Sequence, residues 1–279
     1  MQALTEWSVE DRQGIIGVFT DIDDTLTTDG AITPDALSAL AALKAAGLHV
    51  IPITGRPIGW SEALALRWPV DALVAENGAV AFKKYQLPLQ DGRWQLSKIY
   101  QQNAATRSAN LKRMQAVSAR LLREVPGAAL ARDSPGRETD MAIDHAEFVH
   151  LSTERIAQVL RIMQSEGMSA TVSSIHINGW FGAHNKWVGA CWLVRELWGR
   201  ELAAEIQRWV YVGDSTNDQL MFEAFPHSVG VANIRRFEHQ LAHKPRYITA
   251  AERGAGFAEV ATALLAVRQP SSRPAPARR

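Results

Sequence analysis

Apolar residues in the first part of the chain fall into two patterns, short continuous runs and longer segments with a helical period. The runs are typical of parallel strands that are buried on both faces. The longer segments are bounded by helix signals, such as Thr33-Pro34 at one start and Gly47 at the following end. Because strands and helices alternate, we predict an α/β fold with a Rossmann-like, doubly wound parallel sheet. The strands predicted here are residues 15–20, 48–53 and 72–75, with helices from residues 33 and 61.

The alternation is interrupted in the middle of the chain and returns at Lys186. We therefore predict a core formed by residues 1–84 and 184–268, an inserted α+β module over residues 85–183, and a disordered basic tail over residues 269–279. The region around the insertion is predicted to hold an irregular hairpin (80–94), helices (103–124 and 153–166) and strands (139–143 and 169–177). The later core elements are predicted as helix 186–198, strand 208–213, helix 219–225, strand 228–231 and helix 256–267.

Composition and charge restrict the partners and the cellular compartment that we expect for this protein. The 279 residues carry a net charge of +1, which does not indicate nucleic acid or an anionic membrane as a partner. The one cysteine, Cys191, excludes an internal disulfide and a cysteine-based zinc site. The N-terminal residues lack the basic and apolar regions of a signal peptide, and no apolar run approaches the length of a membrane span. We therefore expect a cytoplasmic protein without a membrane partner.

Two carboxylates, Asp21 and Asp23, directly follow the first predicted strand. Residues two apart in an extended segment point to the same side, and ligands bind at the carboxyl edge of an open parallel sheet. Carboxylates this close repel each other unless a cation compensates, and an all-oxygen site suits a hard cation such as Mg²⁺. An Asp-rich turn after a strand is also common without any function, so the pair is informative mainly together with three further segments.

The second segment, Thr54-Gly55-Arg56, ends the second predicted strand, and Pro57 begins the next helix. Its hydroxyl and the free backbone N–H groups at a helix N-terminus suit a phosphate oxyanion. Arg56 could bind the anion or the substrate through two hydrogen bonds. An ordinary helix cap with a surface arginine would have the same sequence.

The last two segments add a cation and further carboxylates. Lys186 begins a predicted helix, where most lysines are solvated, but its place between the second and fourth segments favours a functional role. Asp214 follows a predicted strand and is a candidate metal ligand. Asn217 and Asp218 could orient the metal, its waters or a phosphate, and an Asx turn that caps the following helix is compatible with this role.

In this order, the four segments resemble the motifs of the haloacid dehalogenase superfamily of phosphohydrolases. The insert after the second motif and the run Glu76-Asn-Gly-Ala79 are similar to its IIB branch. That branch includes Cof-type sugar phosphatases and the phosphatases of sucrose phosphate, trehalose phosphate and mannosyl-3-phosphoglycerate. One departure is Asp24, where most relatives carry glycine, and we expect its side chain to point to solvent or to meet Arg56.

The resemblance implies a role for each matching residue. Asp21 would be the nucleophile that forms an aspartyl-phosphate, and Asp23 the acid/base that protonates the leaving alkoxide and then activates water. Asp23 would reach the metal through its backbone carbonyl, and Asp218 would support the metal site or Lys186. The implied Mg²⁺ site is Asp21, Asp23, Asp214 and Asp218, and the implied substrate-binding residues are Thr54, Gly55, Arg56, Lys186 and Asn217.

The resemblance therefore predicts a Mg²⁺-dependent phosphomonoester hydrolase that acts on a small phosphorylated substrate, either a sugar phosphate or a phosphorylated glycoside. Two alternatives stay open: a sugar phosphomutase of the phosphomannomutase type, and a non-catalytic protein that binds phosphosugars.

The inserted module corresponds to the cap of these relatives, which closes over the core and supplies specificity. Within it, His176 and Trp180 are candidates for contact with a sugar. The alternative interpretations are a half-exposed strand histidine and a packing tryptophan at the hinge. Residues 137–144 loosely resemble a cap strand of trehalose-type relatives.

Overall fold

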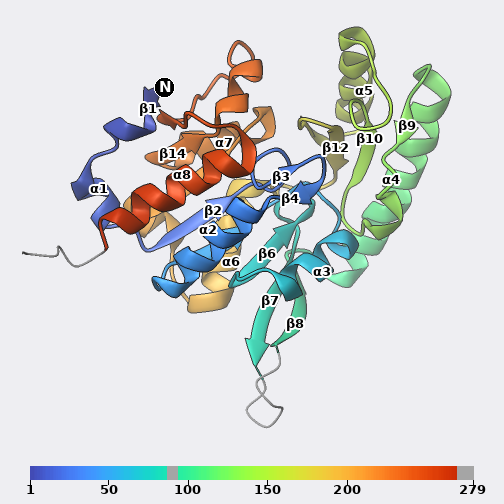
Figure 1. Ribbon diagram of the computed structural model, residues 1–279. Coiled ribbons are helices and arrows are strands. Elements are labelled where there is room, and N and C mark those ends of the chain that lie inside the picture. Colours follow the sequence, from blue (N-terminus) through green and yellow to red (C-terminus); the bar gives the residue numbers. More distant parts are fainter. Residues whose placement is uncertain (87–93, 269–279) are drawn as a thin grey trace, which may run out of the picture.

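A computed structural model describes residues 1–86 and 94–268 and shows a large α/β core beside a smaller cap (Figure 1). The main sheet of the core has six strands, all parallel, in the order β1-β15-β14-β13-β2-β5. The predicted doubly wound parallel sheet is confirmed. Its strands are β1 (Gln2–Ala3), β2 (Gly17–Thr20), β5 (His49–Pro52), β13 (Trp209–Gly213), β14 (His227–Gly230) and β15 (Tyr247–Ile248).

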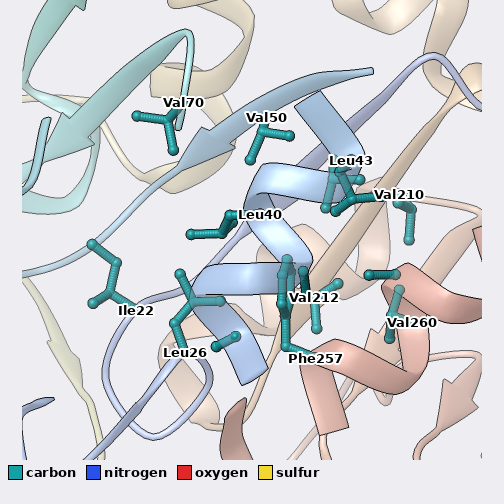
Figure 2. Close-up of a cluster of buried hydrophobic side chains, with 14 of the residues drawn as sticks. Ile22, Leu26, Leu40, Leu43, Val50, Val70, Val210, Val212, Phe257 and Val260 are labelled. Carbon is teal, nitrogen blue, oxygen red and sulfur yellow. The ribbon is translucent and has the colours of Figure 1, made fainter. Parts of the chain in front are cut away.

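Successive residues of the central strands point to opposite faces of this sheet and build two separate apolar clusters. Val18 and Val210 belong to one cluster, whereas their neighbours Phe19 and Tyr211 belong to the other. Figure 2 shows the first cluster, in which α2 and α8 cover the sheet. Helices α6 and α7 cover the opposite face. The bounds are α2 (Pro34–Ala45), α6 (Lys186–Trp198), α7 (Gln219–Ala224) and α8 (Arg253–Ala266), and the short α1 (Val9–Gln13) and the β3–β4 hairpin (Thr27–Thr28, Ala31–Ile32) lie near α8.

A second, antiparallel sheet of β6, β7 and β8 continues the core beyond β5. The hairpin predicted over residues 80–94 is present, but it is regular and not irregular, and its second strand continues to Tyr100. Strands β7 and β8 pair regularly from Val80 with Tyr100 to Gln86 with Trp94, and Phe82 and Leu96 pack into the first core cluster. The buried face keeps this hairpin regular. The bounds are β6 (Ala72–Ala75), β7 (Val80–Gln86), β8 (Trp94–Tyr100) and the adjoining α3 (Ile58–Arg67).

The turn signals Pro88 and Asp91-Gly92 lie outside the described residues, as does the tail predicted over residues 269–279. Among the helices of residues 1–86 and 94–268, none combines the length and the apolar composition needed to span a membrane.

The cap has its own four-stranded antiparallel sheet, in the order β11-β12-β10-β9, and its own apolar cluster with α4 and α5. The single strand predicted over residues 169–177 is wrong, because the chain reverses at Ser173 and two strands pair. The backbone N–H of Ser173 donates to the carbonyl of His176 (2.8 Å), and its hydroxyl accepts from the N–H of His176 (3.0 Å). The bounds are α4 (Ala104–Glu124), α5 (Thr153–Ser165), β9 (Ala129–Leu130), β10 (Met141–Asp144), β11 (Ser169–Val172) and β12 (His176–Trp180).

Buried polar contacts fix the cap segment before β10 to the core. The carboxylate of Glu76 is fully buried and accepts from the backbone N–H groups of Ile58 (2.9 Å), Glu138 (3.0 Å) and Thr139 (2.5 Å). Arg137 donates to the carbonyl of Gly55 at 2.9 Å. Because buried polar groups need partners, these contacts set where the cap sits on the core.

Helix α6 approaches the turn after β6 so closely that we predict a steric cost for any side chain at Gly189. A Cβ there would lie 2.5 Å from Gly78 Cα and 2.9 Å from the Gly78 carbonyl oxygen. Gly189→Ala should lower the free energy of unfolding by about 1–3 kcal/mol, since backbone must shift. Urea denaturation would measure this, with the exposed Val188→Ala on the same helix as a control that changes by less than about 0.5 kcal/mol. Equal stability of Gly189→Ala and the wild type would contradict the close approach.

Candidate active site

The carboxyl ends of β2 and β13 bring three predicted site residues together. Asp21 follows β2, and Asp214 and Asp218 follow β13, the neighbouring parallel strand. Their side chains are buried, and each offers an oxygen within 4.8 Å of the others. The sheet edge thus gathers carboxylates that lie almost 200 residues apart in the sequence.

Lys186, the first residue of α6, lies between two of these carboxylates. Its ammonium Nζ is 2.6 Å from Asp21 Oδ1 and 2.6 Å from Asp218 Oδ1, and its side chain is 3% exposed. The helix start is fixed by Asn185, whose side chain accepts from the N–H of Val188. The lysine is therefore part of the buried cluster and not a solvated helix residue.

The cluster holds more negative than positive charge. Burial raises the pKa of Asp21 to about 8, and the carboxylates of Asp218 and Asp23 add to the rise while Lys186 opposes it. Burial together with Asp21 and Asp218 also raises the pKa of Asp214 well above its usual value. Burial alone would lower the pKa of Lys186, but its two carboxylate partners outweigh burial and raise it. One ammonium thus leaves the carboxylates undercompensated, and a cation would relieve them.

The open acceptors for such a cation are on Asp21 and Asp214. Asp214 Oδ1 is buried and has no hydrogen-bond partner within the described part of the chain. Both carboxylate oxygens of Asp218 are already occupied by hydrogen-bond donors. Oδ1 accepts from Lys186 and from the Tyr211 hydroxyl (2.5 Å). Oδ2 accepts from the N–H groups of Asp214 (2.9 Å) and Ser215 (3.2 Å). Asp218 therefore orients its neighbours. An all-oxygen donor set of this kind fits a hard divalent cation.

Thr54 and Gly55 lie in a loop held from several sides. The Thr54 side chain is fully buried, and its hydroxyl accepts from the N–H of Arg56 at 3.0 Å. A Cβ on Gly55 would lie 3.2–3.3 Å from the side-chain amides of Asn77 and Asn178, which is a tight contact. Glycine at this position avoids it. This loop lines the same cavity as Asp21.

Arg56 contacts carboxylates of both core and cap. Its Nε and Nη2 donate to the carboxylate of Asp23 at 3.1–3.2 Å, its Nη1 to Asp133 at 3.2 Å and its Nη2 to Glu147 at 3.0 Å. The expectation that Asp24 points to solvent or meets Arg56 is wrong, because Asp24 pairs with Arg253 Nε at 3.1 Å. Asp24 has φ of 55°, a conformation that glycine adopts freely and aspartate tolerates.

Two adjoining cavities lie where the cap meets the sheet edge. The narrow one lies among Asp21, Asp23, Thr54 and Asn217 from the core and the Ser173–His176 turn from the cap. The wider one, of about 460 Å³, begins at Asp23 and Arg56 and reaches polar residues and the half-exposed ring of Phe148. Asn217 is held at this edge by the Ser215 hydroxyl, which donates to its Oδ1 at 2.9 Å.

The two cap residues named as candidates for sugar contact, His176 and Trp180, have different surroundings. His176 is buried and not half-exposed, and its Nε2 lies 2.8 Å from Glu147 Oε2 at the narrow cavity. Trp180 is a packing residue: its indole N–H donates to the carbonyl of His184 (2.8 Å), and its ring stacks on that histidine. The alternative interpretation of Trp180 is therefore the one that its contacts favour.

Several residues of the site were not predicted from the sequence, and Asn233, Tyr211 and Glu147 are among them. Asn233 donates to Asp214 Oδ2 (3.2 Å) and to the carbonyl of Asp24 (3.0 Å), and it follows β14, so the strand-end argument could have found it. Tyr211 and Glu147 carry no such signal. The first lies within a strand, and the second reaches the core only through the register of the cap.

Residues 18–96 match the family of haloacid dehalogenase-like hydrolases, and this segment carries Asp21, Asp23 and Thr54. Over these residues the chain is similar to that family. No curated protein matches it by sequence.

Several solved structures resemble most of the chain in fold. The Thermoplasma acidophilum 0175 protein has a TM-score of 0.64 at 19% identity, covering 90% of this chain and 98% of its own. Sucrose-phosphatase from Synechocystis, solved with sucrose and phosphate, has a TM-score of 0.62 at 14% identity, covering 89% and 97%. A haloacid dehalogenase subclass IIB sugar phosphatase has a TM-score of 0.57 at 17% identity, covering 88% and 96%. The likeness thus extends over core and cap together.

The shifted pKa of Glu147 predicts how the free energy of unfolding depends on pH. Its hydrogen bond with His176, with the charge of Arg56 acting in the same direction, lowers its pKa from 4.5 to about 2 although partial burial opposes the shift. A carboxylate with a depressed pKa stabilises the fold fully above its unfolded pKa, and this contribution is lost as the pH falls through 4.5 toward 2.

Glu147→Gln should therefore lower the free energy of unfolding by about 1–3 kcal/mol at neutral pH, allowing for partial exposure. The difference from the wild type should shrink between pH 4.5 and pH 2. Urea denaturation at several pH values would measure both, with the exposed Glu62→Gln as the matched control. A pH-independent difference would contradict the ion-pair origin.

Proposed function

We propose that this protein is a Mg²⁺-dependent phosphomonoester hydrolase that forms an aspartyl-phosphate on Asp21. The observation that carries the proposal is the contact of Lys186 with both Asp21 and Asp218, beside Asp214 Oδ1, which has no partner among residues 1–86 and 94–268. In support of the proposal, Asp21 lines the narrow cavity and lies beside a buried ammonium and an open carboxylate oxygen. Phosphoryl transfer needs these groups because its transition state spreads negative charge over the phosphoryl oxygens.

Each residue at the cavity has its own role in the proposed reaction. Lys186 holds Asp21 through Oδ1, which leaves Oδ2 to attack phosphorus as the bond to the leaving oxygen breaks. Thr54, Gly55 and Asn217 line the cavity and would bind phosphoryl oxygens, together with Lys186. Asp23 gives a proton to the leaving alkoxide and later takes one from the attacking water.

Asp21, Asp214 and the backbone carbonyl of Asp23 would hold Mg²⁺, which neutralises phosphoryl oxygens when bound. Asp218 would act on this site through the N–H groups of the 214–215 loop and through Lys186.

The substrate class that we propose is a sugar phosphate or a phosphorylated glycoside. Two of the similar structures are named as a sucrose-phosphatase and a sugar phosphatase. The cavity of about 460 Å³ beside Asp23 has room for a leaving group of that size, and its polar lining suits hydroxyl groups.

Phosphate release from a panel of sugar phosphates and phosphorylated glycosides tests the proposal. We expect release with Mg²⁺ and none with EDTA. Asp21→Asn should lower kcat/KM at least about a thousandfold, because the nucleophile is lost. Arg195→Gln, an exposed residue at the far end of α6, should leave the rate unchanged.

Two outcomes of this assay would contradict the proposal. Release that survives in Asp21→Asn would contradict the covalent mechanism. Folded wild-type protein that releases no phosphate from any member of the panel, but that moves phosphate between sugar positions, would identify a mutase instead.

A further inference from the structure

The guanidinium of Arg56 holds the carboxylate of Asp23 through two of its nitrogens. Nε lies 3.2 and 3.1 Å from the two carboxylate oxygens of Asp23, and Nη2 lies 3.1 Å from Oδ1. Such a fork fixes the plane of a carboxylate as well as its position. The Arg56 side chain is 8% exposed, so little water competes for these bonds.

The other contacts of this guanidinium come from the cap. Nη1 donates to Asp133 at 3.2 Å, and Nη2 donates to Glu147 at 3.0 Å. Every nitrogen of Arg56 therefore donates to a protein carboxylate. The side chain is committed to these groups, which argues against a direct contact with the phosphoryl group.

The two cap carboxylates are themselves fixed. Glu147 Oε2 lies 2.8 Å from His176 Nε2, and the backbone N–H of Glu147 donates to the buried carboxylate of Asp144 at 2.9 Å. Asp133 also accepts from Arg137, which is bound to the carbonyl of Gly55. The position of Arg56 is thus set by the cap as well as by its own loop.

We propose that Arg56 is a positioning residue through which the cap aligns the carboxyl group of Asp23 for proton transfer. The proposal rests on the proposed function, since it concerns the acid/base step of that reaction. Proton transfer to the leaving oxygen requires the acid to be within hydrogen-bond reach and correctly oriented. Without the fork, the side chain of Asp23 would turn more freely about its two torsions. The acid would then be in place only part of the time.

The test compares two substrates that differ in their need for an acid. A sugar phosphate releases a strongly basic alkoxide, which must be protonated, whereas p-nitrophenyl phosphate releases a stable phenolate, which need not be. The ratio kcat/KM reports the steps up to phosphoryl transfer to Asp21, so later hydrolysis of the aspartyl-phosphate does not enter.

Arg56→Lys keeps the charge and removes the fork. We expect it to lower kcat/KM for the best sugar phosphate by about 10–100-fold, less than the roughly 10²–10⁴-fold of general acid catalysis because the acid is misaligned and not removed. For p-nitrophenyl phosphate we expect a loss of less than about 3-fold. Asp23→Asn should show the same selectivity with a larger loss. Glu147→Gln keeps Arg56 and its contact with Asp133 and weakens the other cap contact, so a smaller loss with the same selectivity is expected.

Arg195→Gln serves as the control, and a thermal melt of each variant separates misfolding from a loss of alignment. If Arg56→Lys does not fold, the selectivity of Glu147→Gln decides the matter. Equal losses on both substrates would overturn the proposal and assign Arg56 to phosphoryl binding or to the fold, and so would no loss on either. Failure of the wild type to hydrolyse either substrate would instead overturn the proposed function.

Discussion

The rest of the site depends on negative charge that is buried at the end of the central sheet. Asp21, Asp214 and Asp218 lie together because β2 and β13 are neighbours whose carboxyl ends share an edge. Buried carboxylates cost free energy unless they are paired, and Lys186 contacts only two of the three. The folded protein therefore gains from a further cation at this edge. A bound cation in turn provides an electrostatic setting that a phosphoryl group can enter.

Polar contacts join the cap to this edge, and they affect the shape of the pocket. Apolar surfaces tolerate sliding, whereas a buried carboxylate such as that of Glu76, held by several donors, has one favourable arrangement. Arg137 extends the junction to the carbonyl of Gly55, next to the residues that line the narrow cavity. The shape of the pocket is thus a joint property of core and cap, and so is the placement of Asp23 through Arg56.

Sequence patterns predicted the parts of the site that follow from the sheet itself. Asp21 and Asp214 could be placed at one edge because each follows a continuous apolar strand, and that edge is shared in any parallel sheet. The partners of Arg56 could not be predicted, since Asp133 and Glu147 reach it only through the register of the cap.

Local chemistry explains the remaining differences. The turn at Ser173 is made by serine hydrogen bonds that carry no signal in the alternation of apolar and polar residues. The pairing of Asp24 with Arg253 likewise joins the loop after β2 to the start of α8, two segments that are far apart in the sequence. Such long-range side-chain pairs are decided by packing in three dimensions.

The central claim, that Asp21 becomes phosphorylated, is tested most directly by trapping the intermediate. Asp23→Asn, with Mg²⁺ and p-nitrophenyl phosphate, should form the aspartyl-phosphate and hydrolyse it slowly, because the leaving phenolate needs no acid but the attacking water needs a base. Borohydride reduction after denaturation converts a phosphorylated aspartate into homoserine, which mass spectrometry of peptides locates. We expect homoserine at position 21. Homoserine at another position, or a stoichiometric burst of p-nitrophenol with Asp21 unmodified, would contradict it.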